Sequence, residues 1–170
     1  MLGRLFPRSL TNAYQGSWAA VWLLAPVLLI KTLMGFNFSG LNPLIDVGEI
    51  IQSVDGVPLD TFSDAAASAV LNSAGAWGMA LFALCLFVWL ILVRYRAGLP
   101  VAILVLLIEQ VGRTGVGTAR AIAEAAAGSA TPTTGALINL ALSAALAIAF
   151  VLSLLRVRNL HADEAQHAKA

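Results

Sequence analysis

Three polar side chains stand together in an otherwise apolar stretch, and their types are the best suited to chemistry in this chain. Glu109, Gln110 and Arg113 follow an uninterrupted apolar run, 101–108. In a helix that begins at Leu99, a rise of about 1.5 Å per residue places Glu109 about 15 Å and Arg113 about 21 Å along the axis. The i, i+4 spacing lets the carboxylate and the guanidinium pair on one face. Ionisable groups at such a depth in a membrane helix are candidates for function, because each costs about 2.5–3.5 kcal/mol there.

Two further polar residues fall at the same depth in other apolar stretches. Lys31 lies about 21 Å from the start of the first stretch, and Asn139 lies about 7 Å from the start of the last one. Because successive membrane helices run in opposite directions, both residues share a level with Arg113. We therefore predict a polar cluster in the outer half of a helix bundle, made of Lys31, Glu109, Gln110, Arg113 and Asn139. Its two cations and one carboxylate give it a net charge near +1.

Two kinds of role are open for this cluster. It can be a ligand site, open toward the outer face, that binds an anionic headgroup, a quinone-like molecule or a small anion, with Glu109 as a proton carrier. It can instead be structural and only hold the helices in register. In a further alternative, Lys31 simply extends its ammonium group to the membrane interface.

Small residues predict which helices pack closely. The third stretch contains glycines that would allow another backbone to approach: Gly112, Gly115 and Gly117. The last stretch has a stripe of small or polar residues that suits such a contact: Asn139, Ser143 and Ala147. We therefore expect these two helices to pack through the three glycines.

The composition of the chain indicates that the residues of the polar cluster lie on membrane helices. The chain has 170 residues, of which 59% are hydrophobic and only 11% are charged, whereas soluble domains carry about 25% charged residues. Four apolar stretches occur, at 17–36, 75–93, 99–121 and 134–155, and about 20 helical residues span a hydrocarbon core of ~30 Å. A helix satisfies its own backbone in lipid, and barrel-type alternation is missing. We therefore expect an all-α, integral membrane four-helix bundle that forms one domain, 1–170.

The distribution of charged residues predicts the orientation of this bundle. Arginines occur before the first stretch, between the second and third, and after the fourth: Arg4, Arg8, Arg94, Arg96, Arg156 and Arg158. The loop 37–74 has no lysine or arginine and contains Asp46, Glu49, Asp55, Asp60 and Asp64. The positive-inside rule then places both termini and the tail 156–170 in the cytoplasm and makes 37–74 an acidic extracytoplasmic loop. We expect this topology in a bacterial inner membrane, with aromatic residues near the inner interface (Trp18, Trp22, Trp89, Tyr95) and the outer one (Trp77, Phe36).

The outer loop contains one clear turn signal. Asp55-Gly56 lies between the segments 50–54 and 57–62. That pattern predicts a tight β-hairpin. Pro58 would weaken the second strand, because proline has no N–H group to donate to a partner strand.

Two helix boundaries follow from capping and breaking residues. Thr61 or Ser63 can cap a helix that begins at Asp64. We expect that helix to continue without a break into the stretch 75–93. The third helix should stop at 128–132, where glycine, serine and proline occur.

Other residues give little support for catalysis, metals or cofactors. Cys85 is the only cysteine, so an intrachain disulfide and a cysteine-based metal site are impossible. His161 and His167 lie in the polar tail at poor ligand spacing, and we expect no metal and no cofactor. The chain has no Ser-His-Asp set, and the glycine-rich segment 112–117 lies inside an apolar helix rather than in a phosphate-binding loop. The few arginines do not form a basic patch, so we expect no nucleic-acid partner.

A set of motifs carries a resemblance to known proteins. The motifs are Arg94-Tyr95-Arg96, Pro100, Glu109 and Gly112-Arg113, after an acidic loop with Gly56-Val57-Pro58-Leu59-Asp60. In these residues the chain resembles a group of small, uncharacterised bacterial four-helix inner-membrane proteins. The resemblance covers most of the chain and implies the same membrane fold, with no activity to carry over. The layout is also distantly similar to other small four-helix families such as DoxX-like proteins, whose motifs the chain does not match.

From the sequence we expect a multi-pass, non-enzymatic membrane protein with an accessory or small-ligand-binding role. One alternative is a small transporter or channel component that uses Glu109 and Arg113. A membrane enzyme is the least favoured alternative, because no catalytic constellation is visible. The expected partner is the lipid bilayer, in which the chain can act as a homo-oligomer or as a subunit of a membrane complex.

Overall fold

The described part of the chain is built from helices. The computed structural model describes residues 11, 12, 14, 16–126 and 133–155, and no β-strand occurs among them. Four helices are long and apolar enough to cross a membrane: α2 (Trp18–Phe38), α4 (Asp64–Arg94), α5 (Leu99–Ala126) and α6 (Thr134–Leu154). The expected all-α membrane fold is confirmed at this level. Several predictions concern residues outside the described ranges: Arg4, Arg8, the helix stop at 128–132, and the tail 156–170 with Arg156, Arg158, His161 and His167.

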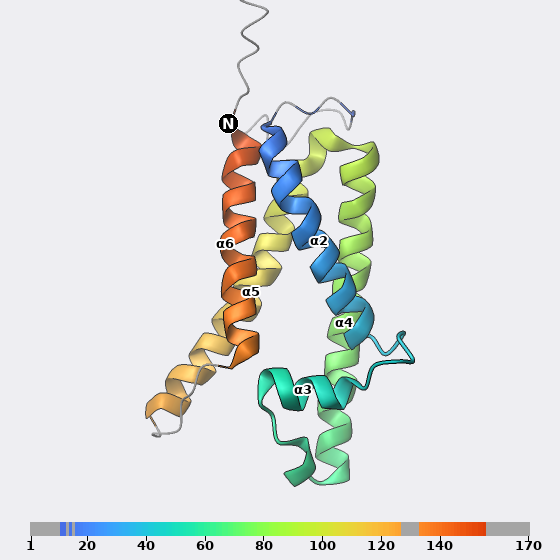
Figure 1. The fold of residues 1–170 in the computed structure, drawn as a ribbon, viewed down its shortest axis with the longest axis vertical. Helices are drawn as coiled ribbons and strands as arrows, with labels where there is room; N and C mark the ends of the chain where they lie inside the picture. The colour runs from blue at the N-terminus through green and yellow to red at the C-terminus, as the bar shows by residue number, and fades with distance from the viewer. Residues whose placement is uncertain (1–10, 13, 15, 127–132, 156–170) are drawn as a thin grey trace, which may run out of the picture.

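The four long helices run side by side, and a short helix crosses one end of them (Figure 1). α2 packs against α4 and α6, and α5 packs against α6, while α4 and α5 touch much less. The short helix α3 (Val47–Asp55) lies near the end where α2 finishes. At the opposite end, Arg96 lies 5.3 Å from the ring centroid of Trp18, and Ser17 N–H donates to Leu152 O at 3.4 Å. Consecutive long helices therefore alternate in direction.

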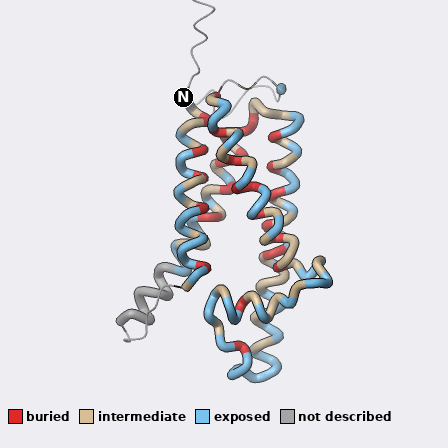
Figure 2. The backbone as a smooth tube through the Cα atoms, viewed as in Figure 1, coloured by how far each residue is buried: buried red, intermediate tan, exposed pale blue. Residues whose placement is uncertain are grey.

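The interior of the bundle is mostly apolar, and large apolar side chains also cover its outside. Buried residues follow the inner sides of the helices (Figure 2). The largest buried cluster consists of Leu24, Val27, Leu28, Leu81, Cys85, Val88, Leu92, Leu99, Ala102, Ile103, Leu106, Leu142, Leu146 and Ala149. On the outside, large side chains such as Trp22, Val93 and Ile108 are exposed. Such a surface would drive association in water, whereas in a bilayer it faces acyl chains.

α2 and α4 approach each other closely at two glycines. A Cβ atom on Gly78 would lie 2.5 Å from the backbone carbon of Phe38. A Cβ atom on Gly35 would lie 2.6 Å from the backbone nitrogen of Phe82. Because these neighbours are backbone atoms, they cannot move aside as a flexible side chain can. The two helices therefore pack at this distance only because both positions lack a side chain.

The predicted glycine contact between α5 and α6 is wrong. A Cβ atom on Gly112, Gly115 or Gly117 would meet nothing within 4 Å. The contact between α5 and α6 includes polar side chains, with Thr114 Oγ1 at 3.2 Å from Ser143 Oγ, and both helices also contribute to the buried apolar cluster. The physical reason is that glycine permits a close approach but does not select the helix that makes it.

The predicted hairpin at Asp55-Gly56 is also wrong, because the helix α3 occupies its first strand. The Asp46 carboxylate caps this helix by accepting a backbone N–H at 2.7 Å. Gly56 ends the helix in the left-handed region, with φ of 70°, and Val57 N–H then donates back to Ile51 O at 3.3 Å. The Asp-Gly pair therefore terminates a helix here, where it was expected to join two strands.

The predicted cap before α4 is confirmed. Ser63 Oγ accepts the N–H of Ala66 at 3.4 Å, and the helix then runs for 31 residues without a break. A 3₁₀ turn, η1 (Leu59–Thr61), leads into this cap. α4 and α5 both extend beyond the predicted apolar stretches, because their polar ends continue the same helices.

Candidate functional site

Lys31 lies in the interior of the bundle rather than at its surface. Its side chain has 0% exposed surface. Nζ donates to Glu109 Oε2 and to Gln110 Oε1, each at 2.6 Å. The alternative in which Lys31 extends to the interface is therefore wrong. A buried ammonium group needs such partners, because an unpaired charge in a low-dielectric interior costs several kcal/mol.

Gln110 is the centre of the cluster and joins three helices. Its side chain is fully buried. Oε1 accepts from Lys31 Nζ at 2.6 Å and from Arg113 Nη2 at 3.2 Å, and Nε2 donates to the Asn139 carbonyl at 3.1 Å. Two cations on one side and a carbonyl on the other fix the orientation of the amide. The structure thus brings the five predicted residues together, and Gln110 provides the link to α6.

Hydroxyl groups continue the contact between α5 and α6. Thr114 Oγ1 donates to Gln110 O at 2.8 Å and lies 3.2 Å from Ser143 Oγ. Ser143 Oγ in turn donates to Asn139 O at 2.8 Å. Thr114 was not among the predicted site residues. Its position one helical turn after Gln110 was the signal that could have found it.

Glu109 and Arg113 form the less complete side of the cluster. Arg113 Nε lies 3.7 Å from Glu109 Oε1, which makes an ion pair but is too long for a hydrogen bond. Both atoms are buried, and neither has a hydrogen-bond partner among the described residues. The side chains of Arg113 and Glu109 are 24% and 21% exposed. The short ion pair of Glu109 is therefore with Lys31, and not with the i, i+4 neighbour that the sequence suggested.

Trp77 of α4 completes the surroundings of Arg113. Arg113 Cζ lies 4.9 Å from the centroid of the Trp77 ring, within the range of a cation–π contact. Trp77 also packs edge-on against Phe38, with ring centroids 5.2 Å apart. The sequence suggested only an interfacial position for Trp77. Counting back from Arg94 places it about 26 Å along α4, close to the level of Arg113, and this signal could have found it.

The cluster combines the groups that proteins use to bind and orient anions. Its ammonium and guanidinium groups pair with one carboxylate, and both donate to one carboxamide oxygen. Arginine in particular presents a planar set of donors that matches carboxylate and phosphate oxygens. No family model, curated protein or solved structure matches the chain. The chemistry of the site is therefore judged from its geometry alone.

Asp55 lies at the point where the end of α3 meets the start of α6. A Cβ atom on Gly135 would lie 2.6 Å from Asp55 Oδ1 and 3.2 Å from the backbone oxygen of Val54, so the two helices approach closely here. Contact with Gly135 desolvates the carboxyl group of Asp55, although the residue as a whole is exposed, and this raises its pKa above the usual value; the positive charge of Arg113 opposes that shift. The acidic loop therefore has a titratable group at the end of the bundle nearest to Arg113.

We expect the contact between α3 and α6 to tighten as the pH falls. Because docking raises the pKa of Asp55, the docked state binds the proton more tightly. The extra stability of the docked state is fully present below the ordinary carboxyl pKa, and it is lost as the pH rises through the raised pKa. Hydrogen-exchange protection factors of the α3 amides should change by up to about tenfold per pH unit in that window, since one proton is involved.

The variant Asp55→Asn should remove this pH dependence of α3. The matched control is Asp60→Asn, which changes another exposed carboxylate of the acidic loop, on the neighbouring turn η1. An Asp55→Asn protein that retained the full pH dependence would show that another group controls the contact.

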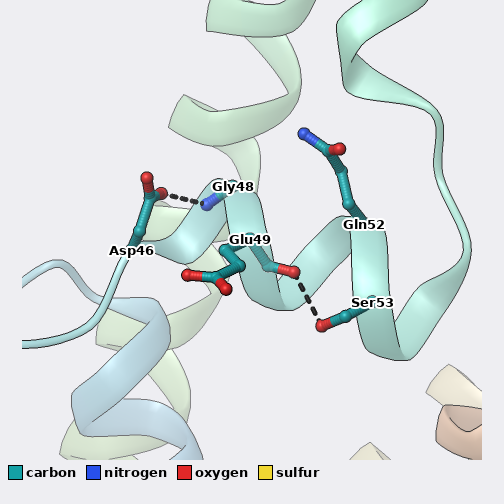
Figure 3. A pocket seen from close by; sticks show the side chains of 5 residues that line it. All are labelled: Asp46, Gly48, Glu49, Gln52 and Ser53. Atoms are coloured by element: carbon teal, nitrogen blue, oxygen red, sulfur yellow. Dashed lines mark hydrogen bonds between the residues drawn. The ribbon is translucent and has the colours of Figure 1, made fainter.

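Two shallow hollows on the α3 side are poorer candidates than the cluster. One is lined by Asp46, Gly48, Glu49, Gln52 and Ser53. Their polar ends do not converge on a common point (Figure 3), and Asp46 and Ser53 use theirs in hydrogen bonds to the backbone of α3. The other lies between α3, the end of α2 and α4, and includes Phe38, Ile45, Leu71 and Ala76. Neither hollow contains a residue of the cluster.

Proposed function

We propose that this protein binds a small anionic ligand at Arg113, as a non-enzymatic multi-pass protein of the bacterial inner membrane. One observation carries the proposal. Lys31 Nζ lies 2.6 Å from Glu109 Oε2, whereas Arg113 Nε lies 3.7 Å from Glu109 Oε1. This Nε atom is buried and has no hydrogen-bond partner among the described residues. A purely structural cluster would satisfy its own donors, because a buried unpaired donor is costly. An anion beside Arg113 would supply the acceptor and neutralise the net positive charge.

The orientation belongs to the same proposal: both termini in the cytoplasm and 37–74 outside. Arg94 and Arg96 lie at the end of the bundle opposite to α3, whereas Asp46, Glu49 and Asp55 lie on α3 or cap it. The positive-inside rule favours the cytoplasm for the arginine end. Arg113 then lies in the outer half of the membrane.

The second candidate function is a small transporter or channel component. The packing of the bundle interior favours binding of a ligand over its passage across the membrane. Lys31 and Gln110 are fully buried. Between them and the arginine end, the interior is filled by apolar side chains such as Leu24, Ile103 and Leu106. A charged ligand at Arg113 would have to cross this layer, which costs several kcal/mol without polar partners. We therefore assign binding from the outer side.

The test measures binding to the full-length protein purified in a mild detergent. The probes are acetate, glycerol phosphate, oleate and phosphatidylglycerol, and the readout is the rise in Tm with probe concentration. We expect at least one probe to bind, and Arg113→Gln to weaken that binding by about tenfold or more, because a hydrogen bond to a charged group is lost. The matched control is Arg94→Gln, which removes an exposed arginine from the opposite end. Equal binding by wild type and Arg113→Gln for all four probes would refute the proposed function.

A further inference from the structure

A strip of exposed apolar residues runs along α5 beside Glu109. Val105, Gly112 and Val116 stand at i−4, i+3 and i+7 from Glu109, so they share one edge of the helix. Val105 and Val116 are 42% and 65% exposed, and Gly112 has nothing within 4 Å of a Cβ position. The partly exposed Glu109–Arg113 pair therefore borders a surface that faces acyl chains.

α4 and α5 open away from each other toward the α3 end. They are joined by a turn at 95–98 and then diverge (Figure 1), and α5 packs mainly against α6. Gly117 lies about two turns beyond the buried Gln110 on the same face, yet a Cβ atom there would meet nothing within 4 Å. Arg113 lies between these two positions and reaches Trp77 on α4. The side chains of Arg113 and Trp77 thus meet between α4 and α5, and at Gly117, about one turn farther along α5, a Cβ atom would meet no neighbour.

From this arrangement we infer the chemical class of the ligand, an inference that rests on the proposed function. The ligand is an amphiphile with one negative charge on a small head, taken up sideways from the membrane leaflet on the α3 side. Its head pairs with Arg113 beside Trp77, and its acyl chain runs toward the bilayer centre along Gly112 and Val105, while Val116 borders the head on the outer side. Arg113 is about 21 Å along α5, and hence about 9 Å below the boundary of a hydrocarbon core of ~30 Å. A small head can reach that depth.

The position of the strip favours an amphiphile over a soluble anion. The charged pair is partly exposed next to apolar residues that face lipid, rather than in a polar cavity open to water. A soluble anion that moved to this depth would lose its hydration, with no apolar part to compensate. An acyl chain gains contacts along the strip and delivers the head from within the membrane.

The test uses matched probes and two matched variants of the full-length protein in phosphatidylcholine nanodiscs. The probes form two pairs, oleate with acetate and phosphatidylglycerol with glycerol phosphate. Their binding is measured by the shift in Tm and by native mass spectrometry. We expect the amphiphiles to bind at least about tenfold more tightly than the soluble heads, a difference of about 1.4 kcal/mol. Gly112→Leu, which fills the strip but leaves Arg113 in place, should weaken amphiphile binding about tenfold. Gly115→Leu, roughly 120° around the helix from Glu109, should not.

Each alternative outcome has a distinct meaning. If acetate or glycerol phosphate binds through Arg113 and Gly112→Leu has no effect, the proposed anion site is supported, but the inference that the ligand is an amphiphile is overturned. If Arg113→Gln weakens binding of none of the probes, the proposed function itself fails. If Gly112→Leu changes the oligomeric mass but not amphiphile binding, the strip contacts a second copy of the chain, and the inference is overturned. Equal losses in Gly112→Leu and Gly115→Leu would overturn it as well.

Discussion

Gly35→Ala and Gly78→Ala will each destabilise the bundle by about 1–3 kcal/mol, the usual cost of overpacking. The new methyl groups would lie 2.6 Å from the Phe82 nitrogen and 2.5 Å from the Phe38 carbon, so α2 and α4 must separate. The free energy of unfolding can be measured by steric trapping or by titration with dodecyl sulfate in mixed micelles. Because Gly35 and Gly78 lie in the same contact, the double variant should lose less than the sum of the single losses.

The matched controls are Gly112→Ala and Gly115→Ala on α5. Both positions have nothing within 4 Å of a Cβ atom, so alanine should cost nothing there. Alanine is also the better helix former, by about 1 kcal/mol in water. If all four variants lost stability equally, the close contact would not be specific to α2 and α4.

Lys31→Met will be the most damaging single change within the cluster, with an expected loss of about 3 kcal/mol or more. The variant leaves Glu109 without its 2.6 Å partner and deprives Gln110 Oε1 of one of its two donors. Methionine has nearly the length of lysine, so packing is largely retained and the loss reports the unpaired carboxylate. Unfolding in mixed micelles is again the measurement, with Arg94→Met as a control at an exposed arginine.

The double variant Lys31→Met/Glu109→Gln should recover part of that stability. It removes the uncompensated carboxylate while Gln110 keeps its bonds to Arg113 and Asn139. Removing both partners of a buried pair is usually far less harmful than removing one. A double variant whose loss equals the sum of the single losses would show that the pair is not coupled in the folded protein.

The short helix α3 shows where sequence patterns are ambiguous. The segment 47–54 mixes apolar and polar residues in a way that fits a strand or a helix, and Asp55-Gly56 can turn a hairpin or end a helix. Burial decided the outcome: Ile51 packs with Leu59 and Phe38, which come from outside this run. A local pattern does not contain that information.

The sequence by itself determined how far along its helix each polar residue lies. Backbone hydrogen bonds fix the rise of a helix, so counting from Leu99 placed Glu109 and Arg113 without any knowledge of packing. The same count put Lys31 and Asn139 at one level, where Gln110 hydrogen-bonds to both. Length and apolar composition were likewise enough to indicate four spanning helices.

Only the tertiary structure decided how each helix is rotated and which neighbours it meets. It gave Glu109 its short ion pair with Lys31 rather than with Arg113, and it put the close contact at Gly35 and Gly78 rather than on α5. The physical reason is that rise along a helix is a property of its own backbone. Rotation about the axis is instead set by side chains from distant segments, which compete for the same space and the same hydrogen bonds.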